Sequence, residues 1–546
     1  MTNTNPPEVA EALQLPVTRH LGWALALISV TQLLIVLDGS IVTIALPVIG
    51  ADLDMSGASL TWLTIGYALF FGGLLLLGGR LGDMFGYRRM LVTGMVGFAV
   101  ASVLGGLAAN GPLLLGVRIL QGSSAALIAP AALALVTTTF PLGAARNRAF
   151  GVYAAMSGAG AGIGLIIGGW LTSMDSFVGI ELDGWRLTFL LNVPIALAIA
   201  VLAPKLLRES PRRRGLVDVP GTVTGSLGIV GLVYGLTRPG EGHGWDDPAT
   251  IGTLAVSVAM LVIFVLIERR AAHPLLPLRI FRNRVRAGGY LALTLAMASM
   301  FAMFYFLTLF VQQILGYSPL RTGIAFLPFA LGIVVTATVA GRAMTRIQPR
   351  IIAGIGTLLA AFSMAMFARL SVDDSPAAAV LAALGGTTVG GNVSYWGQVF
   401  PYLITMAVGM GMVLAGLTPA SLYRLAPQDT GVGSGLFNAA QQLGGSVGLA
   451  VLSSVSLHFT GQRTEQVIGP ITTALPGDPE AVERALLQAT FTEGVTHAFL
   501  VGSILLLIAS LIVWTNTRVQ PNDADGAPRP TMSSEESVRC SIGHDG

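Results

Sequence analysis

Apolar runs of about 20 residues alternate with short polar connections along most of the chain, and runs of that length cross a bilayer as α-helices. Backbone groups inside lipid must bond to one another, which favours helices, and the residue-by-residue alternation of a porin-like barrel is absent. The sequence therefore predicts an all-α polytopic membrane protein. Its fourteen predicted transmembrane helices lie at residues 23–49, 59–79, 91–109, 112–138, 147–172, 186–207, 218–237, 250–268, 287–314, 319–343, 349–370, 401–424, 430–456 and 495–516.

The spans divide into two six-helix halves with two inserted central spans. Arg88 follows Gly79-Arg80 at the same interval as Arg350 follows Gly341-Arg342. Two similar halves around a central site are a common transporter plan. The predicted units are a cytoplasmic N-terminal tail at 1–22, a first half at 23–217, two extra spans at 218–268, a second half at 287–518 and a disordered cytoplasmic tail at 519–546. Two longer outer loops, rich in Gly, Thr, Ser and Pro, are expected at 371–400 and 457–494.

Basic residues fix the expected orientation. Most of the 31 lysines and arginines fall in the even-numbered connections and in the two tails. Cytoplasmic loops carry an excess of such residues, so both termini are predicted to be cytoplasmic. The apolar run that begins near residue 23 is too long for a cleavable signal. We therefore expect a multi-pass protein of the cell inner (plasma) membrane.

Composition excludes several classes of function. The chain of 546 residues is 53% hydrophobic and 11% charged, its mean hydropathy is +0.73 and its net charge is +3. A soluble globular protein needs more surface charge, and no basic stripe suits a nucleic acid. Cys540 is the single cysteine, the six histidines show no metal spacing, and no phosphate-binding Gly-x4-Gly-Lys-Ser/Thr motif is present. We expect no enzyme, metal, nucleotide or other cofactor.

A glycine- and arginine-rich stretch joins the second and third spans. It reads Gly79-Arg80-Leu-Gly82-Asp83-Met-Phe-Gly86-Tyr-Arg88-Arg89 and is predicted as a short loop. Its glycines permit a tight turn, and Asp83 can accept bonds from a helix N-terminus or an arginine. Such a charge clasp could hold the two halves in one state. The alternative is a solvated basic loop that fixes topology alone.

Two charged residues are predicted deep inside spans, Asp38 in the first and Arg118 in the fourth. A buried charge inside a membrane costs several kcal/mol and indicates function. Asp38 lies roughly 16 Å along its helix from the outer end and Arg118 roughly 9 Å, so their direct pairing is left open. Burial favours the neutral acid whereas a nearby arginine favours the carboxylate, and a change in that balance could couple proton flow to transport. The alternative is a structural salt bridge.

The stretch at 79–90 resembles the loop signature of the major facilitator superfamily. Three further segments resemble motifs of its fourteen-span drug:proton antiporters, the QacA/EmrB type: Leu37-Asp38-Gly-Ser-Ile-Val-Thr-Ile-Ala-Leu-Pro47, Arg118-Ile-Leu-Gln-Gly122, and the glycines Gly160, Gly164, Gly168 and Gly169. The resemblance covers about residues 20–518. It implies that the proton is the coupling ion, that Arg118 takes part in coupling, and that the glycine motif favours export. Leu165 stands where the family usually has proline.

Amide and tyrosine side chains in two later spans are the candidate substrate contacts. The ninth span carries Tyr305, Gln312 and Gln313, and the thirteenth carries Asn438, Gln441 and Gln442. Amides that face a cavity could bind varied ligands, whereas amides that face a neighbouring helix would hold helices together.

These patterns predict a proton-driven antiporter that exports small amphipathic drugs or natural products by alternating access. The alternatives are a dedicated exporter of one metabolite (an antibiotic, a lipid or a siderophore), a proton symporter, or a membrane sensor that reuses the fold. The expected partners are the substrate and the lipid bilayer, with no nucleic acid and no nucleotide. A monomer is compatible with the sequence.

Overall fold

A computed structural model provides the structure of the protein. It describes residues 21–141, 144–174, 176–177, 180–181, 183–210, 218–241, 244–271, 274–344, 346–370, 394–425, 430–475 and 478–517. The predicted tail at 519–546, the predicted tail at 1–22 except for residues 21–22, and most of the predicted outer loop 371–400 lie outside these ranges.

The first half contains six transmembrane segments, and the sixth is made of two helices in series. Its helices are α2 (Leu21–Asp52), α3 (Gly57–Phe85), α4 (Tyr87–Gly106), α5 (Gly111–Thr139), α6 (Ala144–Thr172), α7 (Gly184–Leu190) and α8 (Asn192–Leu206). Between α6 and α7, the two-residue strands β1 (Ser176–Phe177) and β2 (Ile180–Glu181) pair antiparallel. Helix α2 packs along α6, α3 along α5, and α4 against both α5 and α8.

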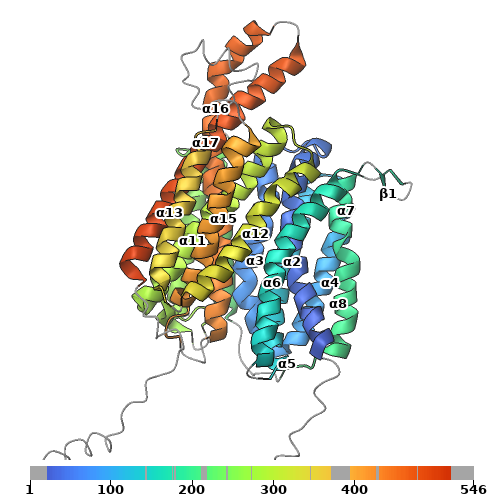
Figure 1. Ribbon diagram of the computed structural model, residues 1–546, viewed down its shortest axis with the longest axis vertical. Coiled ribbons are helices and arrows are strands. Elements are labelled where there is room, and N and C mark those ends of the chain that lie inside the picture. Colours follow the sequence, from blue (N-terminus) through green and yellow to red (C-terminus); the bar gives the residue numbers. More distant parts are fainter. Residues whose placement is uncertain are drawn as a thin grey trace, which may run out of the picture.

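The second half repeats this plan with longer helices at its end. Its elements are η2 (Leu278–Arg282), α11 (Arg284–Leu309), the π-helical turn η3 (Phe310–Ile314), α12 (Pro319–Ala343), α13 (Pro349–Phe367), the π-helical turn η4 (Tyr395–Val399), α15 (Phe400–Ser421), α16 (Thr430–Ala474) and α17 (Pro479–Asn516). Figure 1 shows the two halves side by side, with α2, α4, α6 and α8 in one and α11, α13, α15 and α17 in the other.

The two inserted helices are α9 (Val219–Thr237) and α10 (Pro248–Arg270), joined through the 3₁₀ turn η1 (Arg238–Glu241). Helix α9 contacts α3 of the first half and α16 of the second, so the pair lies beside the seam between the halves. Arg238 Nη2 lies 2.7 Å from Asp247 Oδ2 across the connection, and this hydrogen bond lowers the pKa of Asp247 below its usual value.

Polar residues begin several of these helices because their side chains accept bonds from otherwise unpaired backbone N–H groups. Asn110 Oδ1 accepts from Leu113 N at 2.9 Å at the start of α5. Asp247 Oδ2 accepts from Thr250 N at 3.0 Å at the start of α10. These caps fix where the apolar runs become helical.

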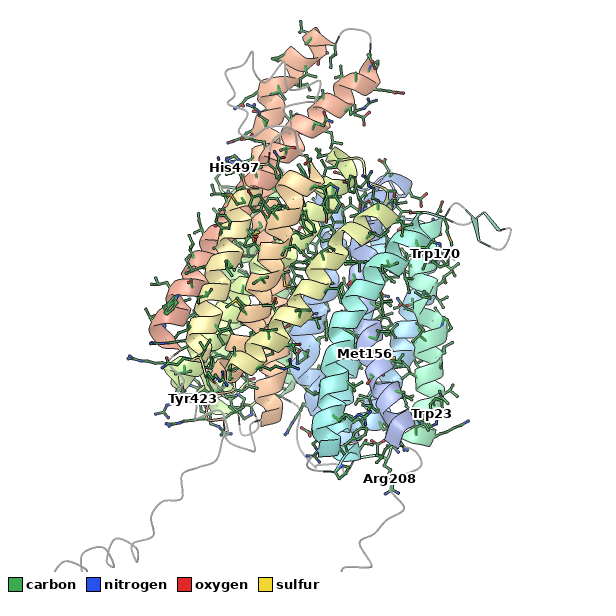
Figure 2. All side chains as sticks on the ribbon, viewed as in Figure 1. Trp23, Met156, Trp170, Arg208, Tyr423 and His497 are labelled. Atoms are coloured by element: carbon green, nitrogen blue, oxygen red, sulfur yellow. The ribbon has the colours of Figure 1, made fainter. Side chains whose placement is uncertain are left out.

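The helices have the length and surface of a membrane-spanning bundle. Thirteen helices in the described part of the chain are long and apolar enough to cross a membrane, and α6 of 29 residues supplies the fourteenth predicted span. Exposed tryptophans lie at or beside helix ends. Figure 2 shows Trp23 at the end that carries Arg208 and Trp170 at the opposite end. Trp245 precedes α10, Trp396 lies in η4, and Trp514 lies near the end of α17. Tryptophan is enriched at both membrane–water interfaces. The fold is therefore that of a multi-pass membrane protein.

In the predicted outer loop 457–494, residues 457–474 and 479–494 are helical. Helices α16 and α17 continue beyond the bundle as a hairpin that projects from the end opposite Arg208 (Figure 1). The hairpin has its own apolar cluster of Val467, Ile471, Ala485 and Ala489, and Asp478 caps α17 by accepting from Ala481 N at 3.0 Å. The sequence left the structure of this outer connection open, because polar residues on the outer faces lower the hydropathy of helices that are nonetheless amphipathic.

Candidate functional site

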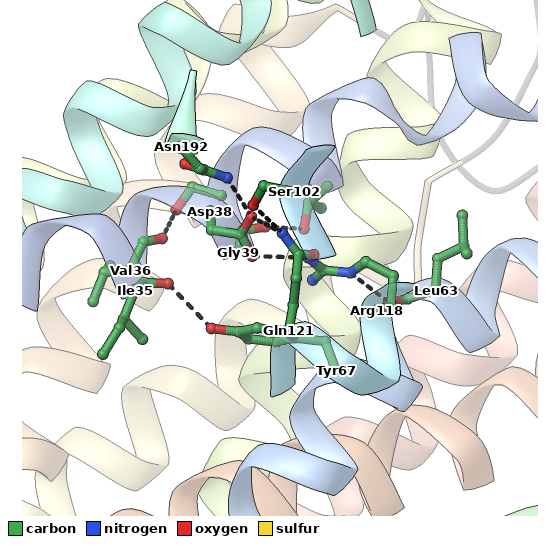
Figure 3. A network of polar contacts seen from close by, with 12 residues as sticks. Ile35, Val36, Asp38, Gly39, Leu63, Tyr67, Ser102, Arg118, Gln121 and Asn192 are labelled. Carbon is green, nitrogen blue, oxygen red and sulfur yellow. Dashed lines mark hydrogen bonds and ion pairs between the residues drawn. The ribbon is translucent and has the colours of Figure 1, made fainter. Parts of the chain in front are cut away.

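Asp38 of α2 and Arg118 of α5 form a buried ion pair. Arg118 Nη1 lies 2.8 Å from Asp38 Oδ2, and the two residues are 2% and 1% exposed respectively. The sequence left this pairing open because Asp38 and Arg118 lie at different depths along their helices. The long arginine side chain spans that difference. Figure 3 shows the pair surrounded by polar groups from neighbouring helices.

Two amide side chains complete the surroundings of the carboxylate. Asn192 Nδ2 donates to Asp38 Oδ1 at 2.8 Å, and Gln121 Nε2 donates to the same oxygen at 3.1 Å. Gln121 also accepts from Arg118 Nη1 at 2.8 Å through Oε1 and donates to Ser102 Oγ at 3.1 Å. The Asp38 carboxylate thus accepts three hydrogen bonds, which compensate for its removal from water.

Arg118 has further partners that do not involve Asp38. Its Nε donates to the carbonyl oxygen of Leu63 at 3.1 Å, and its Cζ lies 4.2 Å from the centre of the Tyr67 ring. The Tyr67 hydroxyl in turn donates to the carbonyl of Ile35 at 3.4 Å. The guanidinium is therefore held by a carbonyl, an amide and an aromatic face even without the carboxylate.

The sequence contained a signal for one of these additional residues. Gln121 lies three residues after Arg118 on the same helix, and such spacing places two side chains on one face. Asn192 had no comparable signal, because it lies between the end of α7 and the body of α8. Pro194 has no N–H to bond to the carbonyl of Leu190, which explains the break just before Asn192.

The glycine- and arginine-rich stretch is helical except at one residue. Helix α3 continues to Phe85 and α4 starts at Tyr87, so the connection predicted as a short loop is Gly86 alone. Gly86 has φ +98°, and a Cβ atom there would lie 2.3 Å from Glu209 Oε1. Both facts require glycine.

Glu209, which follows α8, gathers the basic residues of this stretch. Its Oε1 accepts from the backbone N of Arg88 at 3.1 Å, and its Oε2 lies 3.5 Å from Arg88 Nε and 3.8 Å from Arg89 Nε. Asp83 Oδ1 accepts from the Tyr87 hydroxyl at 2.6 Å. These contacts differ from the expected clasp between halves, since each joins residues of the first half.

Other members of the stretch lie within α3. Arg80 is half-buried near the end of that helix, and Gly79 lies near Pro130 of α5. Gly82 makes room for Tyr87, whose ring would lie 2.5 Å from an added Cβ.

The glycines of α6 bring that helix into close contact with α2 beside Asp38. A Cβ atom at Gly164 would lie 2.9 Å from Ser40 Cβ and 3.0 Å from the Leu37 carbonyl oxygen. Gly160 and Gly168 face α2 in the same way, whereas Gly169 faces the Pro319 carbonyl oxygen of α12. Helix α6 is continuous through Leu165, in agreement with the missing proline.

The candidate substrate contacts in α11 and η3 take part in contacts between the halves. The Tyr305 hydroxyl lies 2.9 Å from Thr61 Oγ1, which is 3.1 Å from Ser453 Oγ. Gln312 Nε2 donates to the Ile44 carbonyl at 3.0 Å. These bonds join helices of the two halves.

The other four candidates have different surroundings. Gln442 lies against Gly72 of α3, because a Cβ added at Gly72 would be 2.8 Å from the Gln442 Cβ. Asn438 is exposed, and Gln313 and Gln441 are half-buried. In the described ranges, no group of three or more His, Cys, Asp and Glu residues could hold a metal ion.

A family model and known proteins match most of the chain. The family model described as Major Facilitator Superfamily matches residues 28–449. "Puromycin resistance protein pur8" of Streptomyces alboniger is 38% identical over 530 residues, which are 96% of this chain and 97% of that protein. "Cephamycin export protein CmcT" of Amycolatopsis lactamdurans is 35% identical over 438 residues, covering 79% of this chain and 84% of the relative.

Solved structures share the fold. An inward-facing, unoccupied bacterial homolog to the human lysosomal transporter Spinster aligns with a TM-score of 0.65 and 17% identity, over 93% of this chain and 98% of that one.

Proposed function

Because the chain belongs to the Major Facilitator Superfamily, we propose that this membrane transporter exports small amphipathic drugs or natural products in exchange for protons. Relatives named for antibiotic resistance and export support the direction and the kind of substrate. The buried Asp38–Arg118 pair supports proton coupling, and it is the observation that carries the proposal. Burying such a charge pair is costly, and here amide groups and a tyrosine ring surround it.

Asp38 is the proposed proton carrier. A proton on Asp38 removes the charge that Arg118 compensates. Arg118 keeps the Leu63 carbonyl, the Gln121 amide oxygen and the Tyr67 ring in either case, so the ion pair can break without leaving a buried cation unpartnered. The protonation state of Asp38 can then bias the packing of α2 against α5 and α8, which is what coupling to alternating access requires.

The orientation follows from charge. The protein is proposed to lie in the cell inner (plasma) membrane. The end that carries Arg88, Arg89 and Arg208 is proposed to face the cytoplasm. The hydrogen bonds of Thr61, Tyr305 and Gln312 join the halves nearer the opposite end. A conformer with these bonds formed is proposed to be closed toward the outside.

Substrate charge is limited by the same pair. Asp38 is paired with Arg118, so the site carries no net charge while both are ionised. Neutral or singly charged amphipathic molecules are the proposed substrates, because a highly cationic one would find no unpaired carboxylate there.

A dedicated exporter of one metabolite is the second candidate. One relative is named for the export of cephamycin and another for resistance to and export of tetracenomycin C. Names with a single compound favour a narrow substrate range. Transport across a panel of unrelated compounds separates the two candidates, since a dedicated exporter moves one chemical class.

The test uses vesicles with reconstituted protein and a pH-sensitive dye. Candidate drugs added to the wild type should drive proton release, and Asp38→Asn should abolish it. Asp246→Asn, which changes an exposed acid between α9 and α10, should leave it unchanged. Full coupled proton movement in Asp38→Asn would contradict the role of Asp38. No movement with any member of a broad panel would contradict multidrug antiport.

A further inference from the structure

Asn192 has an unusual hydrogen-bonding state for a residue with 0% exposure. Its Nδ2 donates to Asp38 Oδ1 at 2.8 Å. Its Oδ1 is buried and has no hydrogen-bond partner among the described residues. Buried polar atoms are nearly always paired, so an unpaired one calls for an explanation. Figure 3 shows Asn192 approaching the Asp38 carboxylate through its nitrogen, with its oxygen directed away.

Protonation of Asp38 changes what its neighbours must provide. The carboxylate accepts hydrogen bonds only, whereas the carboxylic acid has an O–H that needs an acceptor. The ionisable groups that face Asp38 in the described ranges are Arg118 of α5 and Tyr67 of α3. Arg118 has donors but no acceptor. The Tyr67 hydroxyl is directed to the Ile35 carbonyl. Among the described side chains that bond to the carboxylate, the two amides are the ones that carry an acceptor atom.

The two amides differ in the hydrogen bonds that each would lose if its side-chain amide rotated by half a turn. If Gln121 turned its amide over, it would lose the bond that Oε1 accepts from Arg118 and the bond that Nε2 donates to Ser102. If Asn192 turned over, it would lose no bond other than the one to Asp38 itself. An amide presents a donor or an acceptor at nearly the same place after such a turn.

We propose that Asn192 turns its side-chain amide over when Asp38 gains a proton, donating from Nδ2 to the carboxylate and accepting at Oδ1 from the carboxylic acid. The proton enters on Oδ1 of Asp38, the hydrogen bond from Asn192 Nδ2 is replaced by one from the acid O–H to Asn192 Oδ1, and no other covalent bond is made or broken. This inference rests on the proposed proton exchange at Asp38. Asn192 is then a positioning residue that keeps α8 bonded to α2 in both protonation states.

The turn makes a distinctive prediction about two substitutions. Asn192→Leu removes one hydrogen bond from the charged state and one from the neutral state, so the pH midpoint of Asp38 protonation should move by less than about half a unit. Gln121→Met removes a donor whose bond is stronger to the carboxylate than to the neutral acid, and it should raise the midpoint by about one to two pH units. If Asn192 were a fixed donor, both substitutions would raise the midpoint alike.

Infrared difference spectroscopy of the reconstituted protein measures both quantities. A carboxylic acid C=O band that grows as pH falls, and that Asp38→Asn lacks, reports Asp38. With ¹³C-labelled asparagine, the wild type should also show an amide C=O change with the same midpoint, which Asn192→Leu lacks. Thr188→Val, a buried change in α7 whose hydroxyl bonds to Trp185 instead, should keep both signals.

Each outcome decides a separate question. Absence of any Asp38 band between about pH 4 and 10 would refute proton exchange at Asp38. An Asp38 band without the asparagine signal, or an Asn192→Leu midpoint raised as far as that of Gln121→Met, would refute the amide turn while leaving proton exchange intact. If Asn192→Leu does not fold, Asn192→Ser replaces it, because its hydroxyl can donate and accept but gives no amide signal.

Discussion

Among single residues, Arg118 makes the most diverse contacts in the site. Its guanidinium bonds to a carboxylate, an amide oxygen and a backbone carbonyl, and it lies over the Tyr67 ring. Five N–H donors in a flat, rigid group make this set of contacts possible. A lysine has the same charge but is a compact ammonium that cannot reproduce the planar arrangement.

Arg118→Lys should therefore lower the initial rate of drug-driven proton release by about 10- to 100-fold, since hydrogen bonds to charged groups are each worth about 1.5–3 kcal/mol. Tyr67→Phe keeps the ring beneath the guanidinium and should remain within about twofold of the wild type. Vesicle assays at equal protein content measure both. Wild-type activity in Arg118→Lys would show that charge alone suffices.

At the scale of elements, the contact between α6 and α2 positions Asp38. The glycines of α6 allow its backbone to approach the residues on either side of Asp38, including Leu37 and Ser40. Close approach of this kind is how small residues stabilise helix pairs in membranes. The same helix reaches the second half, because a Cβ added at Gly323 of α12 would lie 2.1 Å from the Leu165 carbonyl oxygen. Movements of α12 can thus reach the helix that supports Asp38.

Gly164→Ala should destabilise the protein, because the new Cβ would lie 2.9 Å from Ser40 Cβ and overpacking costs about 1–3 kcal/mol. Gly162 provides the matched control two residues away. Its added Cβ would meet no atom closer than 3.7 Å, so Gly162→Ala should be neutral. Thermal unfolding in detergent compares them, and equal melting temperatures would contradict the packing argument.

At the scale of the whole molecule, the position of one half relative to the other is what alternating access changes. Thr61, Tyr305 and Ser453 bring together α3, α11 and α16 through side-chain hydrogen bonds. Gln312 adds a bond to α2, and Gly169 allows α6 to touch α12. Inserted helix α9 lies beside this seam against α3 and α16, and α10 packs against α9. Among the described residues, these polar contacts join the two halves, and their loss should favour separation of the halves.

Thr61→Val should increase the population that is open at the end opposite Arg208. Loss of the bond to Tyr305 is worth about 1 kcal/mol, which corresponds to roughly fivefold in population. Thr308→Val is the control, because the Thr308 hydroxyl bonds to Phe304 in its own helix. Spin labels at positions 59 and 321 in a Cys540→Ser background report the separation. Indistinguishable distance distributions in the two variants would contradict a gating role for Thr61.

Much of the fold and part of the site could be predicted from the sequence. The apolar runs gave the membrane helices, because lipid leaves a backbone few alternatives to the helix. Asp38 and Arg118 could be singled out because deep charges are rare in such helices. The stretch at 79–90 joins two spans through Gly86 alone, and Gly86 packs against Glu209, which is more than 100 residues away in the sequence.

The tertiary structure decided which polar groups meet. Asn192, Ser102 and Tyr67 come from three helices, and no local pattern relates them to Asp38 or Arg118. The hairpin of α16 and α17 depends on two amphipathic segments that bury each other's apolar faces. The sequence alone thus determined which segments enter the membrane, because hydrophobicity and length act within one segment. Hydrogen-bond partners depend on how helices distant in sequence pack together, and only the tertiary structure specifies that.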